Sequence, residues 1–156
     1  METFFHAALL DLAGVDFVGH THPTAVNALL CAQEPEPLIA GRLFPDEVVY
    51  CGPESAWVPY TDPGLQLARA VRAAAENFIE KWNMPPRVMM IQSHGMIALG
   101  ETTEQVLAAT TTAVKAARVR LGAWSCGGIR PFPPEHLDRI FTRPDEHYRQ
   151  RELDGR

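Results

Sequence analysis

The sequence has no long hydrophobic run, and its arginines are scattered except in the tail after Arg130. No apolar stretch approaches the ~20 residues that a membrane-spanning helix needs, and the first residues lack the basic and apolar segments of a secretory signal. We therefore expect a cytoplasmic protein with no membrane partner. The net charge of −5 argues against nucleic acid as a partner, because that binding depends on clustered Lys and Arg.

Cysteine is also scarce. Cys31, Cys51 and Cys126 lie far apart, and no CxxC pair occurs. This pattern excludes a zinc ribbon and a dithiol redox motif. We expect three reduced and mostly buried thiols.

What is present fits an ordinary globular domain. Hydrophobic residues make up 46% and charged residues 21% of 156 residues, and there is no internal repeat, low-complexity tract or long linker. We expect one domain over residues 1–156, in which residues 129–156 form a C-terminal helical tail.

Apolar residues at helical spacing predict four helices before that tail. A short amphipathic helix covers residues 2–13, and a second begins at Pro23. A third helix covers residues 62–82 and ends before the prolines that follow. The longest helix covers residues 102–124 and opens with Thr102 and Gln105, the two residues of a capping box.

Short β-branched and apolar runs predict the strands. The last two of these runs flank Ser93, His94 and Gly95, a short connection that is typical of a β-hairpin. The predicted strands are Val15–Gly19, Leu38–Ala40, Val48–Cys51, Trp57–Tyr60, Val88–Gln92 and Met96–Leu99.

Three histidines follow strand ends and are candidates for a metal site. Side chains alternate along a strand, so His20 and His22 point the same way and can bind one ion. His94 follows a second apolar strand. Three imidazoles leave a fourth position for water or substrate, which is the arrangement of a catalytic zinc. Each histidine taken alone is also consistent with an ordinary surface or core residue.

Two segments resemble the metal-ligand segments of the class II aldolase/adducin family. They are Gly19-His20-Thr21-His22-Pro23 and, about seventy residues later, the run from Gln92 to Gly100 that contains His94. The family includes fuculose- and rhamnulose-phosphate aldolases, ribulose-phosphate 4-epimerases, decarboxylases and dehydratases. The resemblance extends over most of the chain to about Gly128.

The resemblance implies a fold and an assembly. The expected fold is α/β, a three-layer α/β/α sandwich around a mostly antiparallel sheet. It also implies a homo-oligomer, often a cyclic tetramer with active sites between subunits.

The resemblance also implies a catalytic carboxylate a little under twenty residues before the first ligand. Glu2 stands at that position, eighteen residues before His20. In the aldolases this carboxylate moves a proton while the metal stabilises negative charge. Taken alone, Glu2 is equally an acidic residue in the first turn of a helix, favoured by the helix dipole.

The chain departs from the family pattern in two places. The aldolases have a segment before this glutamate whose loops hold the substrate phosphate, and it has no counterpart here. A misassigned start codon, a truncated chain and a member that has lost phosphate binding are open explanations. The aldolases' tyrosine proton donor has no clear counterpart either, and Tyr50 and Tyr60 are the candidates by region.

These features predict a metal-dependent lyase that breaks a carbon–carbon bond in a small hydroxy-carbonyl or sugar-phosphate substrate, as in carbohydrate metabolism. One divalent ion, zinc first among several that imidazole accepts, would be held by His20, His22 and His94, with Glu2 as the catalytic group. The alternatives are a family epimerase, decarboxylase or dehydratase, and a non-catalytic assembly domain like that of adducin. Neutral imidazole binds metal, so metal affinity is expected to fall as the pH drops through about 6.5.

Overall fold

Four strands form one mixed sheet in the computed structural model, which describes residues 2–142. The strands are β1 (Phe17–Thr21), β2 (Ala56–Val58), β3 (Val88–Ile91) and β4 (Gly95–Gly100), in the order β1-β4-β3-β2. Strand β4 is antiparallel to both neighbours, and β2 is parallel to β3. The expected mostly antiparallel sheet is confirmed.

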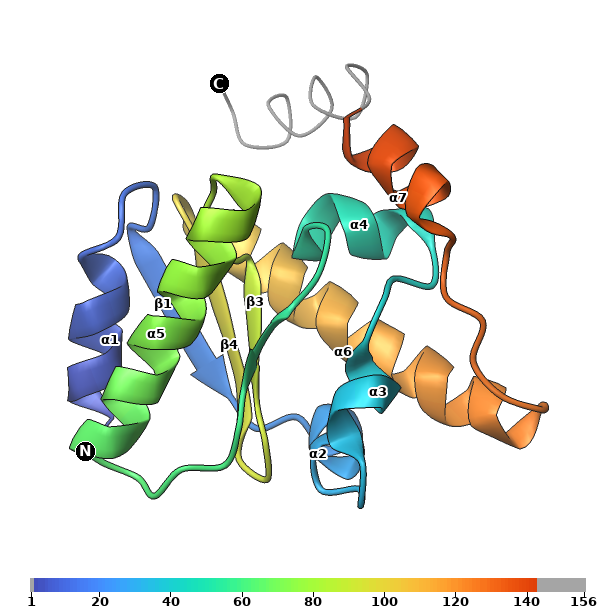
Figure 1. Ribbon diagram of the computed structural model, residues 1–156, viewed down its shortest axis with the longest axis horizontal. Helices are drawn as coiled ribbons and strands as arrows, with labels where there is room; N and C mark the ends of the chain where they lie inside the picture. The colour runs from blue at the N-terminus through green and yellow to red at the C-terminus, as the bar shows by residue number, and fades with distance from the viewer. Residues whose placement is uncertain (1, 143–156) are drawn as a thin grey trace.

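Helices cover both faces of this sheet. Helices α1 (Thr3–Leu10) and α5 (Leu65–Trp82) lie on one face, and α2 (Thr24–Leu30) and α6 (Thr103–Ser125) lie on the other (Figure 1). Successive residues of the central strands feed two separate cores: Ile97 and Leu99 pack with α1 and α5, whereas Met96 and Ala98 pack with α2 and α6. The α/β class and the three-layer arrangement are therefore confirmed.

The two long helices lie close to the predicted ranges. Helix α6 is shifted by one residue, and α5 begins at Leu65, three residues later than predicted, and ends at Trp82 as predicted. The Thr102 side chain accepts a hydrogen bond from the Gln105 N–H at 3.2 Å, and Gln105 Oε1 accepts one from the Glu101 N–H at 2.9 Å. Helix α5 ends at Asn83, whose φ of 54° is left-handed. Helix α1 is shorter than predicted and is followed by a turn that reaches Gly14, where φ is 79°.

The region between α2 and β2 contradicts two predicted strands. Leu38–Ala40 falls in and just after helix α3 (Pro35–Ile39), and Val48–Cys51 falls in helix α4 (Pro45–Cys51). Each helix has a proline in its first turn, which favours a helix start because the missing N–H is not needed there. Acidic residues in both first turns add to that preference.

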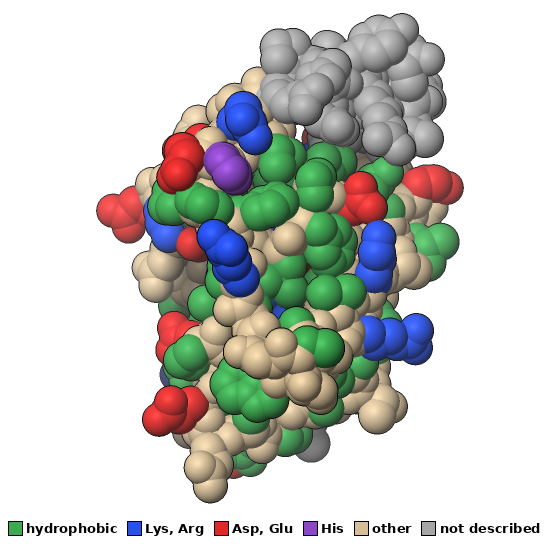
Figure 2. Space-filling view, turned by 90° about the vertical axis from the view of Figure 1, so that its right-hand side faces the viewer, with side chains coloured by type: hydrophobic (Ala, Val, Ile, Leu, Met, Phe, Trp, Pro, Cys, Tyr) green, Lys and Arg blue, Asp and Glu red, His purple; other side chains and the backbone are tan. Residues whose placement is uncertain are grey.

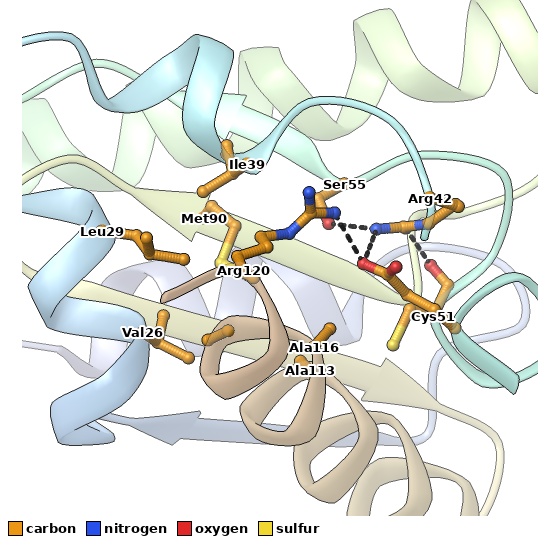
Figure 3. Close-up of a pocket in the computed structure, with 12 residues that line it drawn as sticks. Val26, Leu29, Ile39, Arg42, Cys51, Ser55, Met90, Ala113, Ala116 and Arg120 are labelled. Atoms are coloured by element: carbon orange, nitrogen blue, oxygen red, sulfur yellow. Dashed lines mark hydrogen bonds and ion pairs between the residues drawn. The ribbon is translucent and has the colours of Figure 1, made fainter. Parts of the chain in front are cut away.

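A buried ionic network holds these two short helices against α6. Glu47 lies between two guanidinium groups, with Oε1 at 2.9 Å from Arg120 and 3.5 Å from Arg42 (Figure 3). All three side chains are 2–3% exposed. The guanidinium groups also donate to carbonyls at the ends of the helices: Arg42 to Cys51 and Gly52, and Arg120 to Ala40 and Gly41. Two helix C-termini thus share the positive charge with one carboxylate.

The cysteines and the tail agree with the predictions only in part. All three thiols are free, but Cys31 and Cys126 are exposed, so the expectation of mostly buried thiols is wrong for both. These two are the C-cap residues of α2 and α6, so they follow the helices rather than lie on their packed faces. The tail contains helix α7 (Pro134–Phe141), while its residues 143–156 lie outside the described residues. That one domain covers the whole chain stays a prediction.

No helix among residues 2–142 combines the length and the hydrophobicity needed to cross a membrane.

Candidate metal centre

The three candidate histidines lie at one end of the sheet. His20 is in β1, opposite Ile97 of β4, and His22 follows the end of that strand. His94 is in the three-residue connection between β3 and β4. Figure 1 shows the end of β1, this hairpin and the start of α1 at the same end of the molecule. Strand pairing therefore brings together residues that are more than seventy positions apart.

These side chains converge closely enough that they could hold one metal ion. The Nε2 atoms of His20 and His22 are 2.9 Å apart, and the three imidazole centroids lie 4.6–5.1 Å from one another. Glu2 Oε1 is 3.6 Å from His20 Nε2 and 4.0 Å from His94 Nε2. One ligand atom from each of the four residues lies within 4.8 Å of the others.

His20 is fixed in the orientation that a ligand needs. Its Nδ1 lies 3.0 Å from the main-chain carbonyl oxygen of Met96, so the N–H at Nδ1 donates to that carbonyl and Nε2 keeps its lone pair. This is the usual arrangement of a metal-bound histidine, because the hydrogen bond at one nitrogen selects the tautomer that binds through the other. The Phe5 ring packs against His20 at 5.2 Å and holds the imidazole from the side.

Burial favours the neutral form of two of the imidazoles. The side chains of His20 and His94 are 4% and 17% exposed. Desolvation lowers the pKa of His20, although the Met96 carbonyl and Glu2 oppose that shift, and desolvation also lowers the pKa of His94. Both shifts favour the form that binds metal. The Glu2 carboxylate, 53% exposed, faces the cluster from the solvent side.

The hairpin that carries His94 is tied down on both sides. Ser93 adopts a left-handed conformation with φ of 53°, and its N–H donates to the Leu30 carbonyl at 3.1 Å. The Gln92 N–H donates to the Val58 carbonyl at 2.9 Å, and Gln92 Oε1 accepts from the Tyr60 N–H at 3.1 Å. The ends of α2 and β2 therefore fix this connection.

Gly95 allows the hairpin to approach His22. A Cβ atom at Gly95 would collide with the His22 ring and would lie 2.6 Å from the Thr21 carbonyl oxygen. Only glycine leaves this space free. Neither this contact nor that of Gln92 with Tyr60 could be predicted from the motif that contains Gly95, because both depend on how distant segments pack.

The donor set fits a divalent transition metal. Two nitrogens at 2.0–2.1 Å from a tetrahedral ion lie about 3.3 Å apart. The Nε2 atoms of His20 and His22 are 2.9 Å apart, so they would have to separate only slightly to bind one ion. His20, His22 and His94 supply three neutral nitrogens, and the Glu2 carboxylate lies beside the remaining position. The structure thus brings together all four residues that the sequence analysis named.

The two tyrosines are not part of this cluster. Tyr50 lies in α4, at the end of the molecule away from the hairpin (Figure 1). Tyr60 follows β2 and is 57% exposed, and its hydroxyl donates to Asp62 at 3.2 Å. Neither position gives a proton donor in contact with the cluster.

Comparison with solved structures shows the fold to be shared with larger proteins. An L-fuculose 1-phosphate aldolase matches with a TM-score of 0.70 at 17% identity, over 90% of this chain and 61% of that one. YgbL from Klebsiella pneumoniae, described as a putative aldolase/epimerase/decarboxylase, matches with a TM-score of 0.73 at 22% identity, over 89% of this chain and 64% of that one.

Sequence comparison adds a curated relative and a family. The chain is 28% identical over 117 residues to the uncharacterized oxidoreductase YuxG of Bacillus subtilis, which covers 75% of this chain but only 14% of YuxG. The chain thus spans a small part of that relative and less than two thirds of the solved structures above. The model of the Class II Aldolase and Adducin N-terminal domain matches residues 1–121. The chain therefore belongs to the class II aldolase and adducin family.

Proposed function

We propose that this protein is a metal-dependent lyase that cleaves a carbon–carbon bond in a small hydroxy-carbonyl compound, with a sugar phosphate as one candidate. The observation that carries the proposal is the convergence of Glu2, His20, His22 and His94, whose ligand atoms lie within 4.8 Å of one another. An assembly domain needs no such cluster, because contact with a partner does not require converging imidazoles.

The histidines have the role of holding one divalent ion, with zinc as the first candidate. A bound ion supplies Lewis-acid stabilisation of negative charge on a substrate oxygen. His20 is held by the Met96 carbonyl and by Phe5, and the packing of Gly95 fixes the place of His22. These contacts pre-form the site, so little reorganisation is needed when substrate arrives.

Glu2 has the role of moving the proton. Its carboxylate removes the proton of the hydroxyl on the carbon that leaves as an aldehyde, and the electrons of the broken bond pass to the other fragment. The proton is then returned to a carbon of that fragment, so the two products balance the substrate. The exposed side of Glu2 gives substrate access to this group, as general acid–base catalysis requires.

The substrate is a small molecule, the site of action is the cytoplasm, and the pathway is carbohydrate metabolism. The active protein is a homo-oligomer, with a tetramer as the first candidate from the family resemblance.

The test combines metal analysis with an assay. We expect about one zinc ion per chain in the purified protein, lost in both His20→Ala and His94→Ala. Glu2→Gln should retain zinc yet lose about 10²–10⁴-fold in cleavage of a hydroxy-carbonyl substrate, the usual contribution of a proton-transfer group. His136→Ala, which alters an exposed histidine of α7, is the control and should change neither quantity.

Two outcomes would contradict the proposal. Absence of bound metal after reconstitution with zinc would favour the assembly-domain alternative. Zinc binding with epimerisation, decarboxylation or dehydration in place of cleavage would keep the metal site and replace the reaction.

A further inference from the structure

Helix α1 carries a second polar side chain to the metal centre, one that neither the ligand set nor the proposed proton transfer uses. His6 follows Glu2 by four residues, so both side chains lie on one face of the helix, and the His6 N–H donates to the Glu2 carbonyl at 3.3 Å. The Glu2 carboxylate faces His20 and His94. His6 is therefore on the side of α1 that is turned toward the cluster.

The His6 ring lies one layer outside the candidate ligands. Its centroid is 6.4 Å from that of His20, with the rings at 81°, whereas the three candidate ligand rings lie 4.6–5.1 Å apart. His6 is not one of the four residues whose ligand atoms converge. The ring is thus too far away to join the ligand set and close enough to touch a molecule bound beside it.

Packing holds the His6 ring in place without using its nitrogens. The ring lies 4.8 Å from that of Phe5, which is 1% exposed and also packs against His20. Within residues 2–142, no hydrogen bond or ion pair involves the ring nitrogens of His6. Both ring nitrogens of the half-buried imidazole are therefore available to a ligand.

We propose that His6 is a specificity-determining residue that hydrogen-bonds a hydroxyl of the substrate beyond the oxygens nearest the three histidines. A hydroxyl both donates and accepts, which matches a neutral imidazole. The substrate class is then a polyhydroxylated ketone or aldehyde with at least one hydroxyl outside the reacting pair of oxygens. This inference rests on the proposed function.

Two small ketones that differ by one hydroxyl test the inference. Hydroxyacetone has a carbonyl and one adjacent hydroxyl, and dihydroxyacetone has a second hydroxyl. NMR titration of zinc-loaded protein should show dihydroxyacetone binding about five- to tenfold more tightly, the effect of one added hydrogen bond. His6→Phe keeps an aromatic ring against Phe5 and should abolish this preference, with zinc content and hydroxyacetone affinity unchanged.

Two further variants serve as controls, one at His6 and one at another histidine. His6→Asn retains a donor and an acceptor and should preserve most of the preference, even where His6→Phe folds poorly. His136→Phe replaces another helical histidine that packs near a phenylalanine, with a ring distance of 6.2 Å to Phe132, and should behave like the unmodified protein.

The outcomes separate this inference from the function on which it rests. Equal binding of the two ketones by the unmodified protein, or a preference that survives in His6→Phe, overturns the role of His6 and leaves the proposed function standing. Loss of zinc in His6→Phe also overturns it, because His6 would then support the metal site itself. If neither ketone binds to zinc-loaded protein, the proposed function fails and the inference fails with it.

Discussion

At the scale of single residues, Gly95 has no Cβ atom, and this determines how closely His22 can lie against the sheet. We expect Gly95→Ala to lower zinc affinity by about 10–100-fold, as displaced ligand supports do, and to cost about 1–3 kcal/mol of stability through overpacking. Zinc competition with a chelating dye and urea denaturation measure the two effects.

A matched substitution separates this local contact from a general effect of alanine. Gly122 lies within α6, and a Cβ there meets nothing within 4 Å. Gly122→Ala should leave zinc affinity unchanged and raise stability by about 0.5–1 kcal/mol, because alanine is the better helix former. Equal zinc affinities in the two variants would show that Gly95 does not position His22.

The buried imidazoles predict how stability depends on pH in the metal-free protein. Desolvation lowers the pKa of His20 and His94 in the folded state, so the unfolded state binds more protons below its ordinary value of about 6.5. The free energy of unfolding is therefore highest above about pH 6.5 and falls as the pH drops toward the lowered folded pKa. Thermal unfolding from pH 8 to pH 5 measures this, and a double variant, His20→Asn with His94→Asn, should show a shallower decline.

The candidate site could be predicted in large part at this scale. His20 and His22 follow from strand alternation, and His94 and Glu2 follow from the family resemblance. The supporting contacts could not be predicted, because Gly95 and Gln92 act through segments that are remote in sequence. The sequence predicts only that His6 lies in a helix, and its place near the cluster follows from its distance to His20 in the structure.

At the scale of elements, the errors are concentrated between α2 and β2. Short apolar runs read equally as buried strands or as helix segments, because periodicity needs more residues to distinguish them. The prolines that begin α3 and α4 were the better signal. The longer helices α5 and α6 were predicted correctly because their spacing persists over several turns.

The ionic network that anchors α4 gives a stability prediction. Glu47→Ala leaves the guanidinium groups of Arg42 and Arg120 buried without their shared carboxylate, and a loss of about 3–5 kcal/mol is expected. The neighbouring Asp46→Ala removes an exposed ion pair with Lys115 and one acidic side chain from the first turn of α4, and it should cost about 0–2 kcal/mol. Urea denaturation measures the free energy of unfolding of both variants. Similar losses of stability in the two would mean that the buried carboxylate contributes no more than an exposed one.

At the scale of the whole molecule, large apolar side chains remain at the surface. Figure 2 shows hydrophobic side chains between scattered charges on one face, and Leu107 and Trp124 on α6 are each 64% exposed. Exposed apolar area of this kind is typical of surfaces that meet other chains. We expect sedimentation velocity to give a mass near four times the 17.3 kDa of one chain, and a monomer at micromolar concentration would contradict the proposed tetramer.

Two of the three candidate ligands stand on or next to a strand with only one strand neighbour. In the described part of the chain, β1 pairs with β4 alone, and edge strands open more readily than central ones. Opening of β1 would release His20 and His22 together, so a bound ion and the β1–β4 hydrogen bonds should protect each other. Zinc should then slow amide hydrogen exchange in β1 far more than in the central strand β3, and the rate at which the ion leaves should be limited by how often this edge of the sheet comes open.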